Sequence, residues 1–234
     1  MNPLLTLFEI TGNPHGDPEH SIGSSIRFGP RTQEVLCPGC RRPGIKAKTD
    51  WNAVVSLIGE DAKYFPDVVG GFHHVVSHKA YTSLHNAGCN GFVAHPVDID
   101  TVESPLLHRP FPPYYLLEVT GRVDIDRQLF DEGEGTLCEV CHSWSPKKGG
   151  KHRYGDKVKV PLLNTWDGSD LVKVRNIGSA IGYCSLKVVN LAIRDQWTDF
   201  GIRAFTPRLP KPDLRKPDWL DDLATAIAAK FPDL

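Results

Sequence analysis

The stretch Val75-Val76-Ser77-His78-Lys79-Ala80-Tyr81 returns later in the chain in altered form, as Tyr183-Cys184-Ser185-Leu186-Lys187-Val188-Val189. In both places apolar residues lead into Ser-x-Lys, and apolar residues then recur at three- and four-residue spacing, which predicts a helix. Ser77 and Ser185 stand where an N-cap hydroxyl would accept a hydrogen bond from a free backbone N–H of the first turn. Each stretch therefore predicts a helix that begins directly after a serine, and Gly88 is typical of the residue that ends the first one.

Other features accompany each copy in the same order. A strand-like run closed by proline follows each predicted helix, Gly91 to Pro96 and Phe200 to Pro207. An aspartate and apolar residues precede each helix, at Asp67 and Asp170, and a Cys-x-x-Cys pair ends 27 and 29 residues before them. We predict an α+β fold with an internal duplication into two related β-α-β halves, about 30–110 and 111–207. The alternative is a chance succession, because strand–Ser–helix–strand is a common arrangement.

The two Cys-x-x-Cys pairs are Cys37, Cys40 and Cys138, Cys141. Four thiolates on two short knuckles suit tetrahedral sulfur ligation of a structural zinc ion. The 97 residues between Cys40 and Cys138 far exceed the roughly 15–20 of sequence-local zinc motifs, so the metal would clamp the two halves together in a zinc-ribbon-like site. Pro43 and Gly44 argue against the helix that follows a redox Cys-x-x-Cys pair. An iron–sulfur centre could use the same four thiolates, and this alternative stays open.

Composition sets broad limits on the function. The chain has 234 residues, 40% hydrophobic and 24% charged, with a formal charge of −1, which is typical of a globular protein and gives no electrostatic reason to expect nucleic acid. It has no run of about 18 apolar residues to span a membrane, and its first residues lack the pattern of a secretory signal. We expect a cytoplasmic protein with reduced, metal-binding thiols and no membrane partner.

The C-terminal part differs from the body. We expect residues 1–207 to form a single body of two halves sharing the zinc site, and residues 208–234 to form a proline-rich linker and a helix. Four prolines in the segment from Pro207 to Pro217, both ends included, indicate the linker. Beyond it, one helical stripe predicts a helix that packs on the body: Trp219, Leu220, Leu223, Ala224, Ile227, Ala228 and Phe231.

Several cysteine, aspartate and histidine side chains could serve catalysis or metal binding, or could have structural roles. Cys89 and Cys184 could act as nucleophiles, but a small buried hydrophobe is the commoner use of cysteine. The segment Trp166 to Asp170 could bind a cation, but its Asp-Gly-Ser sequence favours a tight turn. Five histidines could form a second metal site or a polar surface: His73, His74, His78, His85 and His95. Hydrolase, Walker-type and dinucleotide motifs do not occur, so we predict no enzymatic activity and no small-molecule substrate.

Taken together, the two Cys-x-x-Cys motifs, the Trp166-Asp167-Gly168-Ser169-Asp170-Leu171 segment and Cys184-Ser185 opening a helix resemble the bacterial double-CXXCG motif family, over about residues 30–207. That family consists of immunity proteins of kin-directed polymorphic toxin systems. The resemblance implies a non-enzymatic, zinc-binding protein whose partner is a cognate toxin. The family's glycine after each second cysteine, which often allows positive φ, is Arg41 and His142 here.

The leading expectation is therefore an immunity protein that neutralises its toxin by steric occlusion, with side chains near the second knuckle, Glu132, Glu134, Trp144 and Tyr154, as candidate contacts. The alternative is a zinc-ribbon nucleic-acid-binding protein. It rests on basic residues beside the two knuckles, which would form one patch if the knuckles meet: Arg41, Arg42, Lys46, Lys48, Lys147, Lys148, Lys151 and Arg153.

Overall fold

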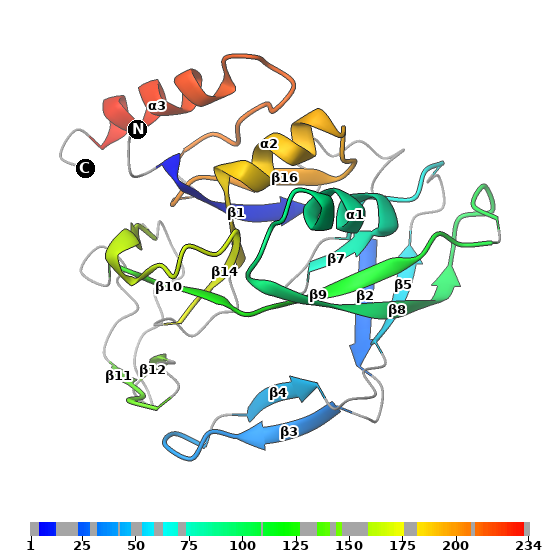
Figure 1. The fold of residues 1–234 in the computed structure, drawn as a ribbon, viewed down its shortest axis with the longest axis horizontal. Helices are drawn as coiled ribbons and strands as arrows, with labels where there is room; N and C mark the ends of the chain where they lie inside the picture. The colour runs from blue at the N-terminus through cyan, green and yellow to red at the C-terminus, as the bar shows by residue number, and fades with distance from the viewer. Residues whose placement is uncertain are drawn as a thin grey trace.

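A computed structural model describes residues 5–12, 23–28, 32–41, 43–47, 53–58, 63–69, 74–108, 110–126, 135–140, 144–146, 159–175, 182–206 and 209–231. These residues form a mixed α+β fold with two six-stranded sheets, two small hairpins and three helices, as the sequence predicts for the fold class. Figure 1 places the helices along one side of the molecule and the two hairpins on the other.

The first sheet combines the N-terminal strand with strands of the second half of the chain. Its order is β13 (Pro161–Leu162), β10 (Gly121–Ile125), β14 (Leu171–Val174), β15 (Gly182–Ser185), β1 (Leu7–Gly12) and β16 (Phe200–Arg203). A 3-10 turn, η2 (Leu163–Thr165), follows β13. Strand β1 pairs antiparallel with both β15 and β16, so the first strand of the chain lies between two of its last.

The second sheet is built from the first half of the chain. Its order is β2 (Gly23–Phe28), β5 (Ala53–Ile58), β8 (Phe92–Val102), β9 (Tyr114–Val119), β7 (His74–Ser77) and β6 (Val68–Val69). Strand β9 pairs antiparallel with both β7 and β8. The run β6-β7-β9-β8 therefore has the same order and strand directions as β14-β15-β1-β16 of the first sheet.

Two short helices follow matching strands. Helix α1 (His78–Asn86) begins directly after β7, and helix α2 (Leu186–Arg194) directly after β15. The predicted serines are both the N-caps, but only the Ser77 hydroxyl accepts the capping bond, from the backbone N–H of Ala80 at 3.2 Å. Gly88 has a φ of +63° just after α1, as expected for a residue that ends a helix.

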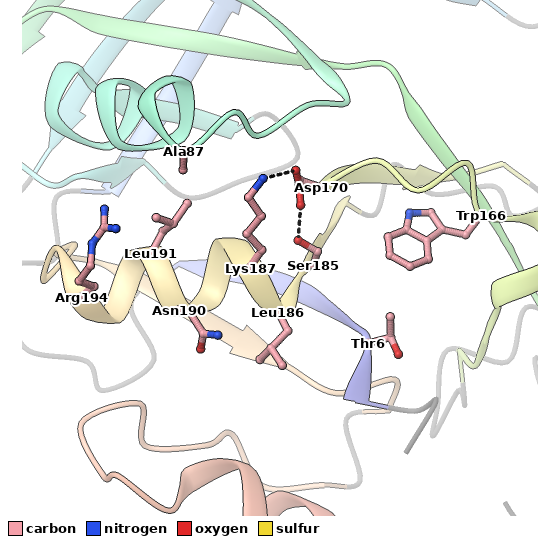
Figure 2. Close-up of a pocket in the computed structure, with 10 residues that line it drawn as sticks. All are labelled: Thr6, Ala87, Trp166, Asp170, Ser185, Leu186, Lys187, Asn190, Leu191 and Arg194. Carbon is pink, nitrogen blue, oxygen red and sulfur yellow. Dashed lines mark hydrogen bonds and ion pairs between the residues drawn. The ribbon is translucent and has the colours of Figure 1, made fainter. Parts of the chain in front are cut away.

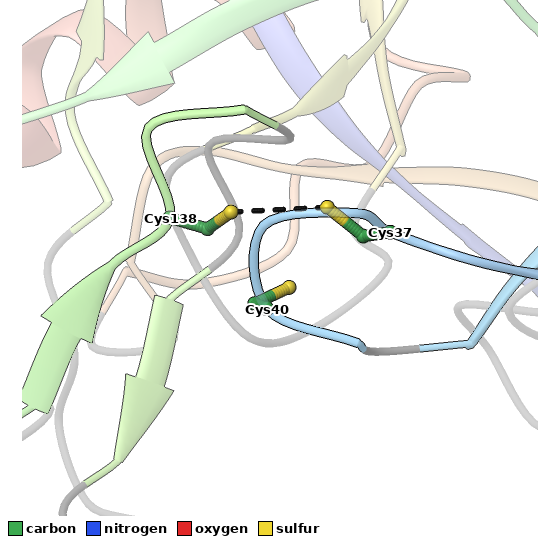
Figure 3. Close-up of side chains that lie close together, drawn as sticks. All are labelled: Cys37, Cys40 and Cys138. Atoms are coloured by element: carbon green, nitrogen blue, oxygen red, sulfur yellow. Dashed lines mark hydrogen bonds between the residues drawn. The ribbon is translucent and has the colours of Figure 1, made fainter.

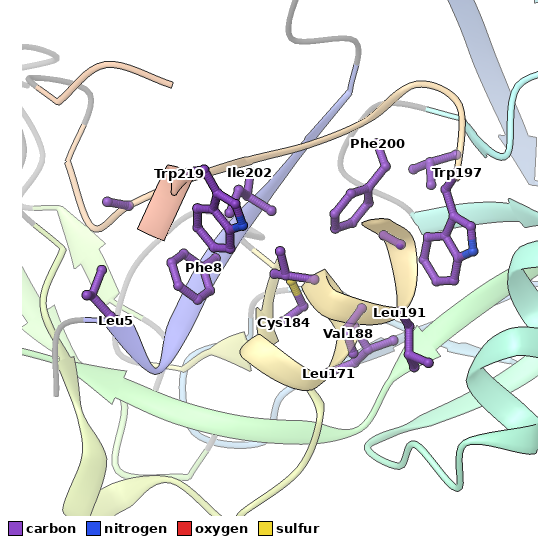
Figure 4. Close-up of a cluster of buried hydrophobic side chains, with 14 of the residues drawn as sticks. Leu5, Phe8, Leu171, Cys184, Val188, Leu191, Trp197, Phe200, Ile202 and Trp219 are labelled. Carbon is purple, nitrogen blue, oxygen red and sulfur yellow. The ribbon is translucent and has the colours of Figure 1, made fainter. Parts of the chain in front are cut away.

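The largest core cluster lies where both helices meet the two sheets and the C-terminal helix α3 (Trp219–Lys230) (Figure 4). Trp219, Leu223 and Ile227 are buried at four-residue spacing, so this face of α3 packs on the body as the sequence stripe predicts. The Trp219 ring meets Phe8 of β1 edge-on, with ring centroids 5.8 Å apart. Smaller clusters fill the opposite faces of the two sheets.

Some elements differ from the sequence reading. The apolar run at residues 53–58 is too short for its periodicity to distinguish a helix from a strand, and it forms strand β5. The β-rich sequence that begins at Tyr114 predicts a strand reaching to Asp126, but the structure has two strands there, β9 and β10, in different sheets. The chain changes sheet at Gly121, where a Cβ would lie 2.2 Å from the Leu171 carbonyl oxygen, so only glycine permits this approach. Strand β8 continues through Pro96, because its pairing with β5 begins only at Val97.

Candidate metal centre

Each Cys-x-x-Cys pair begins at the turn of its own small hairpin. Strands β3 (Thr32–Leu36) and β4 (Pro43–Ala47) pair up to Leu36 and Pro43, and the first knuckle lies between those residues. Strands β11 (Gly135–Leu137) and β12 (Trp144–Pro146) likewise pair up to Leu137 and Trp144, around the second knuckle. A tight hairpin brings its two sulfurs near one another, and the fold then has to bring the two hairpins together.

The fold brings them together, as Figure 3 shows for Cys37, Cys40 and Cys138. Their Sγ atoms all lie within 4.8 Å of one another, and Cys37 Sγ is 3.8 Å from Cys138 Sγ. A tetrahedral ion with zinc–sulfur bonds of about 2.3 Å separates its sulfurs by about 3.8 Å, whereas a disulfide would need about 2.05 Å. These three cysteines could therefore hold a metal ion. The fourth predicted ligand, Cys141, lies outside the described residues.

The first knuckle closes with a backbone hydrogen bond from the Arg41 N–H to the Cys37 carbonyl oxygen, at 2.8 Å. Arg41 has a φ of +56°, in the left-handed region that glycine adopts without cost. In the double-CXXCG motif family, which the sequence resembles, this position is glycine. Here the backbone has the same left-handed conformation at an arginine. The Arg41 side chain is exposed.

Gly39 is the point of contact between the knuckles. A Cβ at this position would lie 2.9 Å from a methyl carbon of Val140 and 3.0 Å from Cys138 Sγ. The first knuckle thus lies directly on the second, with no room for a side chain between them. Val140, although it makes this approach, keeps 58% of its surface exposed, so the joined knuckles form an outer part of the molecule.

The other two described cysteines lie away from this cluster. Cys184 is fully buried, and burial raises the pKa of its thiol well above the usual range. Burial, with the Asp170 carboxylate as the next cause, raises the pKa of Cys89 to about 11. Both thiols are protonated near neutral pH and would be poor nucleophiles or ligands, in agreement with a structural role.

Asp67 receives bonds from both halves of the chain. Its Oδ1 accepts from the Ser77 hydroxyl at 2.6 Å, and its Oδ2 accepts from Lys79 Nζ at 2.9 Å and from the Thr198 backbone N–H at 3.0 Å. Lys79 Nζ also donates to the carbonyl oxygen of Gln196, which follows α2, at 3.0 Å. Asp67 and Lys79 therefore fasten the start of α1 to the end of α2.

Asp170 repeats this arrangement in the opposite direction (Figure 2). Its Oδ1 accepts from the Ser185 hydroxyl at 2.7 Å, and its Oδ2 accepts from Lys187 Nζ at 3.3 Å and from the Asn90 backbone N–H at 3.2 Å. Lys187 Nζ donates to the carbonyl oxygen of Gly88, after α1, at 3.2 Å. We call the two arrangements the aspartate clasps. An open pocket of about 590 Å³ lies beside the second clasp along α2.

In the sequence an aspartate, Asp67 or Asp170, precedes each Ser-x-Lys stretch. This pattern did not predict that each aspartate accepts hydrogen bonds from the serine and the lysine of the stretch that follows it. The repeated serine and lysine were the available signal. Within the Trp166 to Asp170 segment the predicted turn is present: Asp167 Oδ1 accepts from the Ser169 N–H at 3.0 Å and Gly168 has a φ of +81°. Asp170 instead bonds across the fold, which only the tertiary structure decides.

The described histidines do not join a metal cluster. His78 and His85 lie on α1, and His95 Nε2 is 2.8 Å from a Glu118 carboxylate oxygen. Of the described residues, only the three cysteines group closely enough to hold an ion. His73 lies outside the described residues, as does the His74 side chain. So do the side chains of the remaining predicted contacts and basic residues, Arg41 excepted: Glu132, Glu134, Trp144, Tyr154, Arg42, Lys46, Lys48, Lys147, Lys148, Lys151 and Arg153.

These features define an α+β protein with a cysteine cluster that could hold a metal ion. No helix in the described part of the chain has both the length and the apolar character needed to cross a membrane. The sequence matches no protein-family model and no curated protein.

Proposed function

We propose that this chain is an immunity protein that binds a cognate toxin and blocks it sterically, with its fold held by one structural zinc ion. The observation that carries the proposal is the meeting of the two knuckles, whose cysteines are far apart in sequence yet have sulfurs 3.8 Å apart. A metal at this point would stabilise a binding surface rather than supply chemistry. The motif resemblance supplies the class of partner.

The proposed ligands are Cys37, Cys40, Cys138 and Cys141. The sulfurs of the first three lie within 4.8 Å of one another, and the 3.8 Å between Cys37 Sγ and Cys138 Sγ is the separation expected of tetrahedral sulfur ligation. Cys141 follows Cys138 at the same spacing that separates Cys40 from Cys37, so the second knuckle can supply its second thiolate in the same way. Two hairpins that each contribute one knuckle would form a zinc-ribbon-like site.

Internal duplication is the second part of the proposal. Four positions of the first half have counterparts 108 residues later that make the equivalent hydrogen bonds. The pairs are Ser77 and Ser185, Lys79 and Lys187, Gly88 and Gln196, and Asn90 and Thr198. Gln196 has a φ of +50°, beside +63° at Gly88, although a left-handed glutamine is unfavourable. The matching sheet orders add support. Each proposed unit takes its central strand from a different place, β9 in the first and β1 in the second.

A binding role agrees with how the polar groups are used. The hydroxyls of Ser77 and Ser185 donate to their own aspartates, and both lysines bridge to the opposite unit. These groups stabilise the pairing of α1 with α2. The raised thiol pKa values of Cys89 and Cys184 also favour a structural role.

The test combines metal analysis with toxin rescue. Purified protein should contain one zinc per chain by elemental analysis, and Cys138→Ser should lose it while Cys89→Ser retains it. A visible absorption band of an iron–sulfur centre, or undiminished zinc in Cys138→Ser, would contradict the shared zinc site. For the partner, co-expression with the product of the neighbouring gene should rescue growth from its toxicity. Steeply salt-dependent binding to arbitrary nucleic acid without any rescue would favour the alternative function.

A further inference from the structure

An aromatic surface lies on the side of α1 that faces away from α2. The rings of Tyr81 and Tyr115 stack with centroids 4.3 Å apart, and His78 and His85 flank the stack at 5.9 and 6.0 Å. The Tyr115 hydroxyl is 3.4 Å from His78 Nδ1. Both histidines are exposed and both tyrosines are half-buried. We call these four residues the α1 surface.

The strand registers match this surface to a buried region in the other half. Val76 of β7 pairs with Tyr115 of β9, and Cys184, 108 positions after Val76, pairs with Phe8 of β1. Phe8 therefore takes the place of Tyr115. On the helices, Val189 takes the place of Tyr81 by the same offset.

Burial differs consistently between the matched positions. Phe8 and Val189 are fully buried, whereas Tyr115 and Tyr81 are half-buried. On the neighbouring strands, Ile202 and Ala204 are buried, and their counterparts Ala94 and Pro96 are half-buried and exposed. The same face of the same strand–helix arrangement is covered in one half and open in the other.

The C-terminal segment provides the cover in the second half. Trp219 of α3 packs on Phe8 beside Ile202 (Figure 4), and Leu223 and Ile227 continue the buried face of this helix. Helix α3 is amphipathic, with Asp221 and Asp222 exposed in its first turn. The protein thus contains an example of what binds this kind of face: an amphipathic helix with an aromatic anchor.

We propose that the α1 surface binds an amphipathic helix of the toxin, in the position that α3 occupies on the other half. This inference rests on the proposed function and adds where the partner binds and by what kind of element. Tyrosine is enriched at residues that dominate binding energy, and a helix laid on an apolar face is a common mode of recognition. The segment 78–86 has no carboxylate, so His78 and His85 favour acidic side chains beside the partner's anchor.

A peptide with the sequence of residues 216–231 can serve as the probe. It contains the helix that covers the corresponding face in the second half, with Trp219 as the anchor and Asp221 and Asp222 as the acidic side chains. Binding of the fluorescein-labelled peptide to the full-length protein is measured by anisotropy. We expect saturable binding that Tyr81→Ala weakens about tenfold, the size of a hot-spot loss. His85→Glu should also weaken binding, and a peptide with lysine at both aspartate positions should restore it. Asn190→Ala, on the exposed side of α2, is the matched control and should bind unchanged.

Absence of saturable binding, or binding unaffected by both Tyr81→Ala and His85→Glu, would overturn the assignment. Self-association of the full chain that Tyr81→Ala abolishes would also overturn it, because the occupant would then be a second copy. The co-expression test separates this inference from the proposed function. Rescue that is equally strong with Tyr81→Ala would leave the immunity role in place and remove the α1 surface from it.

Discussion

Replacing Asp67 with alanine tests whether the aspartate clasps hold the two halves together. The Asp67 side chain is only 8% exposed. It accepts hydrogen bonds from Ser77 Oγ, Lys79 Nζ and the Thr198 backbone N–H. Alanine removes these acceptor contacts at once, together with a longer one from the Thr198 hydroxyl at 3.4 Å, and leaves the Ser77 hydroxyl and the Thr198 N–H without an acceptor.

The size of the stability loss caused by Asp67→Ala depends on how exposed each hydrogen-bond donor is. Lys79 is 51% exposed and can turn to water, so its share is about 0–1 kcal/mol. The Ser77 hydroxyl is buried and the Thr198 N–H is partly buried, and each would cost about 1–3 kcal/mol when left without an acceptor. These contributions together give an expected loss in free energy of unfolding of about 2–7 kcal/mol. That is a large part of the roughly 5–15 kcal/mol that stabilises a typical domain.

Urea unfolding followed by circular dichroism measures this loss. Asp67→Asn should lose less, because the amide can still accept one hydrogen bond and donate to the Ser77 oxygen. Lys79→Met should cost at most about 1 kcal/mol. Asp98→Ala, at an exposed carboxylate on β8, is the matched control and should change stability by no more than about 0.5 kcal/mol. If Asp67→Ala unfolds at the same urea concentration as Asp98→Ala, with an unchanged slope, the clasp does not join the halves as argued.

Three further predictions follow from the same contacts. Arg41→Gly should raise stability by a few tenths to about 1 kcal/mol, because glycine adopts a φ of +56° without steric cost and loses part of that gain through its freer unfolded chain; a loss in urea unfolding would contradict it. Gly121→Ala should cost several times the roughly 1 kcal/mol of Gly88→Ala, since its Cβ would lie 2.2 Å from the Leu171 carbonyl oxygen while Gly88 has only its positive φ; equal urea midpoints would refute this. After metal removal, mass spectrometry of iodoacetamide-treated protein at pH 8 should find Cys37, Cys40 and Cys138 alkylated first. Cys89 should react only as the pH rises toward its pKa of about 11, and early labelling of Cys89 would contradict its burial.

The local structure of the second clasp could be predicted from the sequence in part. The Ser185 position at the start of a helix and the turn at Gly168 follow from local preferences, which depend on neighbours in the chain. The bond between Asp170 and Asn90 spans 80 residues. No local pattern specifies such a pairing, because either side chain could satisfy its hydrogen bonds with nearer groups or with water.

The strand assignments show the same limit. The β-rich composition of residues 114–119 indicates a strand, but the change of sheet at Gly121 depends on how closely Leu171 approaches. The placement of β1 between β15 and β16 joins the first strand of the chain to two of its last. Such a pairing is selected by the whole arrangement of faces and edges, and a strand's own sequence carries little information about its partners.

The sequence by itself determined the repeated strand–serine–helix stretches, the C-terminal helix and the cysteines able to bind a metal, because each depends on residue types at short spacing. Tertiary structure alone decided that the thiols of two distant knuckles meet, that each aspartate fastens to the opposite half, and that α3 covers one half while the matching face of α1 stays open. These are contacts between segments far apart in the chain, and their free energy exists only once the sheets and helices have packed.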